Sequence, residues 1–117
     1  MTKVAIVVNG KENSSLYPSF ILGSSALAWD ADTYLFFTPG AAPALKPGYL
    51  EDIKSKGMPD MDKLVKDFNQ LGGKLILCVL ALEAKDLKKE ELRTDIEIMD
   101  ASTFMEKILD ANVTFSF

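Results

Sequence analysis

Short apolar runs that favour strands alternate with segments of helical periodicity along the whole chain, and this alternation restricts the fold more than any other feature. Strand–helix–strand order is typical of parallel sheets whose faces are covered by helices. We therefore predict one α/β domain over residues 1–117, a three-layer sandwich with a mainly parallel sheet of about five strands. The predicted strands are rich in β-branched, aromatic or leucine residues and comprise residues 4–8, 33–38, 74–78, 96–98 and 113–117.

The helical segments are recognised by their spacing and by their ends. Residues 59–71 place apolar side chains three and four positions apart with charged side chains between them, and the pair Gly72-Gly73 then favours a left-handed stop. A helix after the first strand is expected to be capped by Ser14 or Ser15. A third helix is predicted over residues 100–110, with Asp100 or Ser102 as its cap.

The least regular part of the chain is residues 39–57, which contain three prolines and three glycines. Long irregular segments inside compact domains are often lids or binding loops, but such a segment can also be a surface connection that only reaches the next helix. Both interpretations stay open. Asn9, Gly10, Pro39 and Gly40 form a candidate pocket, because they follow the first two strands and ligands of open α/β sheets bind beyond the carboxyl ends of strands.

Composition argues against several kinds of chemistry. The chain has no histidine and one cysteine, Cys78, so it lacks Ser-His-Asp and Cys-His catalysis, histidine zinc ligands, an intrachain disulfide and a Cys-x-x-Cys motif. Its formal charge of −4 and scattered basic residues argue against nucleic-acid binding. No Gly-x-Gly-x-x-Gly or P-loop motif is present. We expect no metal and no cofactor, and we assign paired aspartates such as Asp60 and Asp62 to capping.

Neither a secretion signal nor a membrane span is expected. The apolar run near Val4 covers about five residues, fewer than the roughly 7–15 of a signal-peptide core. The apolar stretch over residues 34–45 is interrupted by prolines and a glycine and falls short of the roughly 20 residues of a transmembrane helix. We therefore expect a cytoplasmic protein without membrane contact.

Cys78 is the residue best suited to chemistry. It ends the apolar run 74–78, and open α/β sheets place reactive groups beyond the carboxyl ends of their strands. If residues 79–86 begin a helix, the backbone amides of Val79 and Leu80 and the helix dipole would stabilise a thiolate at Cys78. A free cysteine is also among the most frequently buried residue types. From the residues alone, a reactive thiol and a packed thiol both stay open.

Four segments follow one another in an informative order: Met58-Pro59-Asp60, an amphipathic helix, the run from Gly72 to Cys78, and Leu87-Lys88-Lys89-Glu90-Glu91-Leu92. In this order, and over nearly the whole length, the chain resembles the DsrE/DsrF-like sulfur-relay family and, within it, the peroxiredoxin-like branch. The resemblance implies a five-stranded α/β sheet, assembly into trimers or hexamers, and a cysteine that holds sulfane sulfur as a persulfide. In this chain that cysteine is Cys78. The chain departs from the branch at Val79-Leu80-Ala81-Leu82, where methionine and serine are common.

These observations predict a small intracellular sulfur-transfer protein in which Cys78 accepts sulfane sulfur from a donor protein and passes it to an acceptor. The alternative is a non-catalytic oligomeric binding module or structural subunit in which Cys78 is packed in the core. A cysteine peroxidase resolved by an external thiol is a third option with less support. A homo-oligomer is expected for both main hypotheses, because residues 113–117 alternate like an edge strand or a face shared with a partner.

Overall fold

Five strands form one sheet in the computed structural model, which describes residues 1–117. The strands are ordered β4-β3-β2-β1-β5, and all four neighbouring pairs are parallel. The α/β class and the five-stranded sheet are therefore confirmed, and every strand pair, rather than most of them, is parallel. The strands are β1 (Lys3–Val8), β2 (Asp32–Phe37), β3 (Lys74–Cys78), β4 (Ile96–Met99) and β5 (Val113–Ser116).

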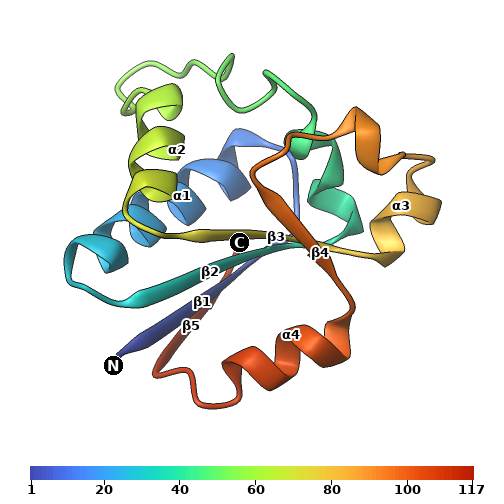
Figure 1. Cartoon of the computed structure of the whole chain (residues 1–117). Coiled ribbons are helices and arrows are strands. Elements are labelled where there is room, and N and C mark those ends of the chain that lie inside the picture. Colours follow the sequence, from blue (N-terminus) through green and yellow to red (C-terminus); the bar gives the residue numbers. More distant parts are fainter.

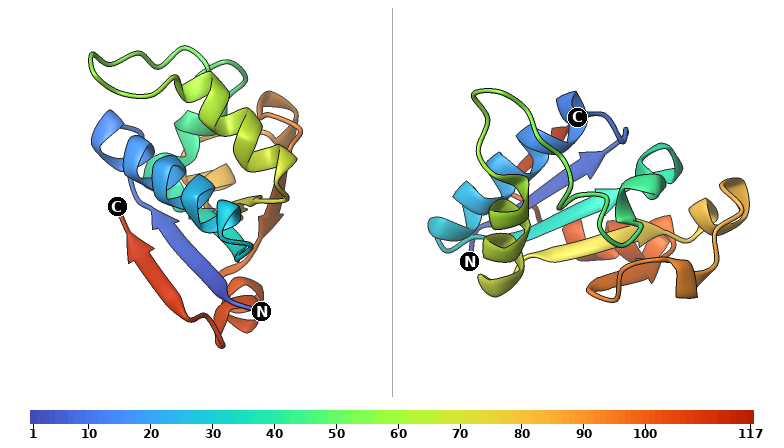
Figure 2. Two further views of the ribbon diagram at one scale, coloured as in Figure 1. Left: turned by 90° about the vertical axis from the view of Figure 1, so that its left-hand side faces the viewer. Right: turned by 90° about the horizontal axis from the view of Figure 1, so that it is seen from above.

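Helices cover both faces of the sheet and complete the three predicted layers (Figure 1). The helices α1 (Asn13–Ala28) and α2 (Met61–Gln70) lie side by side on one face, and α4 (Ala101–Ile108) lies alone on the other (Figures 1 and 2). The 3-10 segment η1 (Pro39–Leu45) follows β2, whereas α3 (Leu80–Ala84) and the turn η2 (Lys89–Glu91) connect β3 to β4. No helix of the chain combines the length and the apolar character needed to cross a membrane.

The two faces of the sheet are covered unequally. The face under α1 and α2 belongs to a cluster of 22 buried residues, whereas the cluster on the α4 face has five. Strand β3 shows the division, because alternate side chains of a strand point to opposite faces. Leu75 and Leu77 belong to the larger cluster, and Ile76 and Cys78 belong to the smaller one. The only thiol of the chain therefore lies on the thinly covered face.

Two helix starts and one helix stop are formed as predicted. The side chain of Asp60 caps α2 by accepting the amide of Asp62 at 3.2 Å, and that of Asp100 caps α4 by accepting the amide of Thr103 at 2.7 Å. After α2, Gly72 has φ +90°, a conformation that side-chain-bearing residues rarely adopt. Capping aspartates and a left-handed glycine thus fix these boundaries.

The predicted cap of α1 is wrong. This helix begins at Asn13, Glu12 holds the N-cap position, and no side chain caps the helix. The backbone carbonyl of Glu12 accepts the amides of Ser15 and Leu16, both at 3.0 Å. Ser14 and Ser15 therefore lie inside the first turn, where their hydroxyl groups are past the capping position.

The first part of the irregular segment is neither a lid nor a surface connection. Ala41, Ala42, Ala44 and Leu45 in η1 have no exposed surface, and Leu50, which follows, is equally buried. The small alanine side chains let η1 pack closely against the sheet and α3. Residues 46–48 are exposed, and residues 51–60 form a longer exposed loop, which runs above the amino-terminal half of α1 (Figures 1 and 2).

Strand β5 is an edge strand, which confirms that part of the prediction. It pairs only with β1, and all four of its residues are exposed. Val113 and Phe115 are 41 % and 36 % exposed although both are apolar. No residue of β5 carries a charge, so the outer edge of the sheet lacks the charged side chains that usually discourage strand pairing.

Candidate functional site

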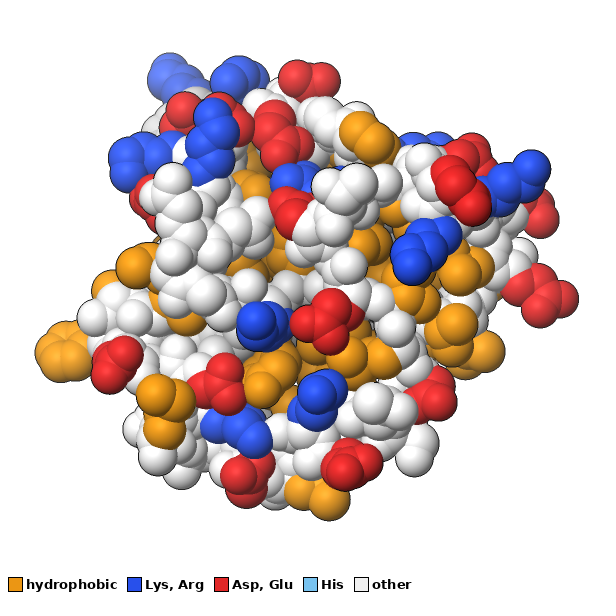
Figure 3. Space-filling view, viewed as in Figure 1, with side chains coloured by type: hydrophobic (Ala, Val, Ile, Leu, Met, Phe, Trp, Pro, Cys, Tyr) orange, Lys and Arg blue, Asp and Glu red, His pale blue; other side chains and the backbone are white.

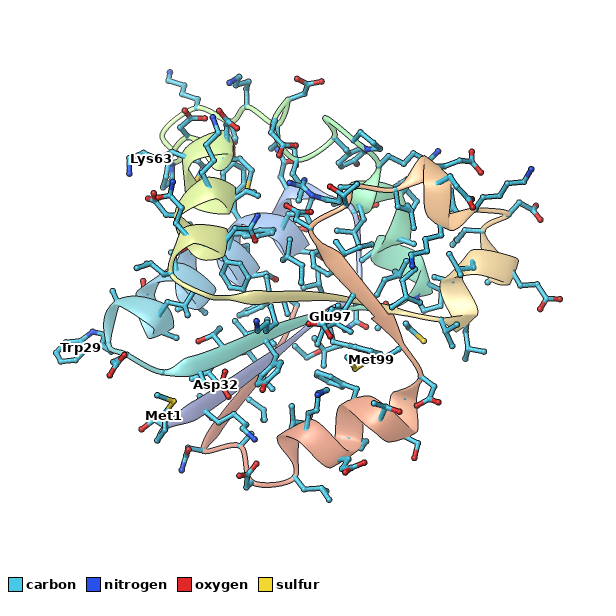
Figure 4. The ribbon with its side chains drawn as sticks, in the orientation of Figure 1. Met1, Trp29, Asp32, Lys63, Glu97 and Met99 are labelled. Atoms are coloured by element: carbon cyan, nitrogen blue, oxygen red, sulfur yellow. The ribbon has the colours of Figure 1, made fainter.

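Cys78 lies at the carboxyl end of β3, as predicted, but its side chain is covered. The residue is 5 % exposed and belongs to an apolar cluster with Phe36, Ile76 and Phe104. Its register partner in β4 is Met99, which Figure 4 shows on the side of the sheet that faces α4. The thiol therefore sits where ligands gather in open α/β sheets, and a reactant reaches it only after side chains around it move.

The backbone after Cys78 offers less to a thiolate than expected. The amide of Val79 donates to the carbonyl of Met99 at 3.0 Å, so it ends the β3–β4 ladder and is not available to the sulfur. The predicted role of Val79 is wrong for that reason. Leu80 opens α3, but this helix has five residues, and so short a helix aligns few peptide dipoles. The side chains of Val79 and Leu80 are instead exposed, by 40 % and 67 %.

The candidate pocket of Asn9, Gly10, Pro39 and Gly40 is a closed contact. A Cβ atom on Gly40 would lie 2.6 Å from the carbonyl oxygen of Asn9, so the two backbones touch. The amide of Asn9 donates to the carbonyl of Phe117 at 2.7 Å. None of the four residues lines any of the three surface cavities of the molecule. The structure brings these residues together, but the missing side chain of Gly40 lets the loops close and leaves no room for a ligand.

A largely buried arginine that the sequence analysis did not identify forms the densest polar cluster. Arg93 donates to both oxygens of Glu51, at 3.2 and 2.8 Å, and to both oxygens of Asp95, at 2.7 and 3.0 Å. Its side chain is 11 % exposed. The amide of Asn69 in α2 donates to Asp95 at 2.7 Å, and the backbone amide of Arg93 donates to Leu45 at 3.0 Å. Arg93 thus joins the loop after η1, the start of β4 and α2.

The electrostatics of this cluster are structural rather than catalytic. Burial acts to raise the pKa of the Asp95 carboxyl, but the hydrogen bonds and charge of Arg93 outweigh it and hold that pKa below its ordinary value. The two carboxylates take four of the five N–H groups of the guanidinium and balance its charge, so little of it is left for an anionic ligand. The short spacing Arg93-Thr94-Asp95 is a local sign of the ion pair between Arg93 and Asp95. Nothing in the sequence pattern indicates that Glu51 joins it.

Helix α4 is fastened to the sheet by one buried side chain and by an ion pair just past its end. Phe104 is its one buried side chain and belongs to the same apolar cluster as Cys78. Beyond the end of α4, the ammonium group of Lys3 in β1 binds the carboxylate of Asp110 at 2.6 Å, and this bond holds the pKa of Asp110 below its ordinary value. In the space-filling view, hydrophobic side chains show between charged ones where α4 meets the sheet (Figure 3).

These features define a class of small α/β protein. They are a parallel five-stranded sheet, helices on both of its faces and a lone thiol at the carboxyl edge. The sequence matches the profile of the DsrE/DsrF-like family over residues 2–117. The chain belongs to the DsrE/DsrF-like family, which confirms the resemblance at the level of the family.

Known relatives place the chain in the same fold. The uncharacterized protein MJ0760 of Methanocaldococcus jannaschii is 30 % identical over 98 residues, which are 83 % of this chain and 35 % of that protein. The chain thus spans about a third of the length of this relative. The crystal structure of the ychN protein from E. coli has a TM-score of 0.78 at 21 % identity, with all of both chains covered. MTH1491 from Methanobacterium thermoautotrophicum, a protein of unknown function, has a TM-score of 0.67 at 10 % identity, covering 98 % and 99 % of the two chains. At these identities the structural likenesses establish the fold.

Proposed function

We propose that this protein is a sulfur carrier whose working group is the thiol of Cys78. The single observation that carries the proposal is the position of the only cysteine, at the carboxyl end of β3 in a chain of the DsrE/DsrF-like family. The family suggests sulfur relay in general, and thiol–persulfide exchange requires only one sulfur nucleophile. It does not require histidine, which the chain lacks.

The transfer consists of two exchanges at sulfur. The thiolate of Cys78 attacks the terminal sulfur of a donor persulfide, the new Sγ–S bond forms, the donor S–S bond breaks, and the donor leaves as a thiolate. In the second exchange an acceptor thiolate attacks the terminal sulfur on Cys78, and Cys78 leaves as a thiolate. One sulfur atom moves from donor to acceptor, and no external oxidant or reductant is consumed.

Burial of Cys78 gives this proposal a physical condition. At 5 % exposure the thiol cannot meet a donor protein in the closed structure, so α4 or the residues after β3 must open locally. The apolar surroundings of Phe36, Ile76 and Phe104 would then shield a persulfide from small reductants between the two exchanges. Local opening of a weakly covered face requires much less free energy than global unfolding.

Intact mass spectrometry tests the proposal directly. Native protein is incubated with inorganic polysulfide, and Cys78→Ser serves as the matched control. The expected result is a gain of one sulfur atom in the wild type, reversed by a reducing thiol and absent in Cys78→Ser. A gain of sulfur that persists in Cys78→Ser would contradict the proposal. So would the absence of a gain in the wild type, if its thiol is alkylated under the same native conditions and is therefore accessible.

A second candidate function is a binding module or structural subunit in which Cys78 is only a core residue. The observation that favours it is the low exposure of the thiol within an apolar cluster. Alkylation separates the two candidates. A carrier thiol is labelled slowly but completely under native conditions, whereas a permanently packed thiol is labelled only after denaturation.

We also propose that the protein works in the cytoplasm as a homo-oligomer, a trimer or a hexamer, and exchanges sulfur with donor and acceptor proteins. The exposed, uncharged strand β5 and the exposed apolar residues Val79 and Leu80 support a contact between copies. A reduced thiol at Cys78 suits a reducing compartment. Light scattering of the purified protein tests the assembly, and a mass equal to one chain would contradict it.

A further inference from the structure

An open cavity of about 470 Å³ is lined by α1 and by the exposed loop that precedes α2. Both segments lie on the opposite side of the sheet from α4 (Figure 1). It shares no residue with the surroundings of Cys78 or with the Arg93 cluster. The loop forms one wall and Tyr17 of α1 contributes to the other. The cavity is lined by Tyr17, Ile53, Lys54, Ser55, Lys56, Met58, Pro59 and Asp60.

Tyr17 has an unused hydrogen-bonding group at this cavity. The residue is 3 % exposed, yet its hydroxyl has no partner in the protein. The other two tyrosines are satisfied, since Tyr34 donates to Asp32 at 3.1 Å and Tyr49 donates to the carbonyl of Lys11 at 3.0 Å. Because no fully buried side-chain oxygen lacks a partner in this structure, the oxygen of Tyr17 keeps some exposed surface, and Tyr17 lines this cavity. A nearly buried hydroxyl held at a cavity wall is available to a ligand.

The charges around the cavity leave one positive group without a partner. Lys54 lies 3.9 Å from the carboxylate of Asp60, which also caps α2. Lys56 forms no ion pair, so the three charged side chains of the lining sum to one positive charge. Between these groups, Ile53 and Met58 present apolar surface. An apolar wall with one spare cation and one free hydroxyl suits a ligand with an apolar body and a single negative charge.

We propose that this cavity binds a small organic carboxylate. The apolar body would lie against Ile53 and Met58, and the carboxylate would pair with Lys56 and accept a hydrogen bond from the hydroxyl of Tyr17. A phosphate ester, with nearly two negative charges, would require more than the one spare lysine, and no arginine lines the cavity. The proposal is independent of Cys78 and of sulfur transfer.

Titration of the full-length protein followed by amide NMR tests the proposal with benzoate as the probe and benzamide, its neutral analogue, as the control. We expect benzoate to shift the amide signals of Tyr17, Ser55 and Lys56 in a saturable way. We expect its affinity to exceed that of benzamide by about fivefold or more, because the amide cannot pair with Lys56. Equal affinity of the two compounds, saturable shifts confined to another surface, or no saturable shift at tens of millimolar would overturn the proposal.

Three variants separate a ligand site from general surface binding. Tyr17→Phe keeps the packing of the ring and should weaken benzoate about threefold to tenfold through loss of one hydrogen bond, with the affinity for benzamide changed less. Lys56→Gln should weaken benzoate to the level of benzamide. Lys46→Gln removes an exposed lysine outside the cavity and should leave both affinities unchanged. If Lys46→Gln weakened benzoate as much as Lys56→Gln, binding would be non-specific and the proposal would be wrong.

Discussion

Phe36 in β2 and Phe104 in α4 stack with their ring centroids 4.2 Å apart and their planes 12° from parallel. Both rings belong to the cluster that buries Cys78, and Phe104 is the only buried side chain of α4. The stack is therefore the main apolar attachment of α4 to the sheet. If this face opens as proposed, we expect the strength of the stack to set how often it does so.

Replacing Phe104 should expose Cys78. Phe104→Leu is expected to weaken the attachment of α4 by about 1–2 kcal/mol, and 1.4 kcal/mol corresponds to a tenfold change in an opening equilibrium. Alkylation of Cys78 under native conditions should then be about tenfold faster than in wild type. The measurement is the time course of iodoacetamide labelling by intact mass.

Phe68→Leu is the matched control for this experiment. Phe68 is buried in the larger cluster on the other face, so its replacement should lower global stability without loosening α4. We expect its labelling rate to stay within about twofold of wild type while local opening dominates. Equal acceleration in the two variants would mean that Cys78 is reached through global unfolding rather than by movement of α4.

Replacing the planar guanidinium group of Arg93 with the ammonium group of lysine should destabilise the protein. Arg93→Lys loses the paired hydrogen bonds to Glu51 and Asp95, and we expect a decrease of about 1–2 kcal/mol in the free energy of unfolding. Lys63→Gln removes an exposed pair with Asp67 at 2.8 Å and should cost less than about 0.5 kcal/mol. Urea unfolding of both variants measures the difference. Comparable losses would show that the buried cluster adds nothing beyond a surface pair.

The pH dependence of stability should reflect Asp95. A carboxyl whose pKa is lower in the folded state than its ordinary value of 3.8 stabilises the fold above that value, and the contribution disappears as pH falls through the folded pKa. Stability of the wild type should therefore decline on acidification below pH 3.8. Asp95→Asn should show a shallower decline, because the group that titrates is gone.

Asp52→Asn serves as the control for this pH series, since Asp52 is exposed and forms no ion pair. Urea unfolding at a series of pH values from neutral to acidic gives the slopes for all three proteins. Asp100 and Asp110 also have lowered pKa values, so the free energy of unfolding depends on pH to some extent in every variant. The same slope in Asp95→Asn as in wild type would contradict the assignment.

A side chain at position 40 should separate the loops after β1 and β2. In Gly40→Ala the new Cβ atom would lie 2.6 Å from the backbone carbonyl of Asn9, which cannot rotate away. We expect a loss of about 1–3 kcal/mol of stability. In Gly10→Ala the new atom would meet the flexible side chain of Glu12, also at 2.6 Å, and this side chain can move. Thermal unfolding of both variants measures the difference. A lower melting temperature for Gly10→Ala than for Gly40→Ala would contradict the close contact.

The strands and α2 could be predicted because their causes are local. The apolar run of β3 and the helical spacing of α2 are visible in short windows of sequence, and Gly72 marks the stop between them. The segment η1 could not be predicted in the same way, because its buried residues are mostly alanines around prolines. Such a sequence looks like a loop until a neighbouring surface covers it.

The candidate site was predictable in position but not in exposure. Strand alternation already places Cys78 on the same face as Ile76, but the thin cover of that face depends on how α4 packs. The pair of Arg93 and Glu51 joins residues 42 positions apart, so no local pattern reveals it. The bond from the amide of Val79 to Met99 in β4 joins residues 20 positions apart, so the sequence alone does not show that this amide is taken from the thiolate.

The position of β1 between β2 and β5 has a consequence for the nascent chain. Val4, near the start, is the register partner of both Thr33 and Val113, so the second neighbour of β1 is made more than a hundred residues later. While the ribosome is still producing α4, β1 therefore has a free hydrogen-bonding edge, and closing this distant pair carries the largest loop-entropy term of the sheet. A nascent chain that lacks β5 would offer that edge to other unfinished chains, which makes translational arrest before β5 the stage most exposed to aggregation.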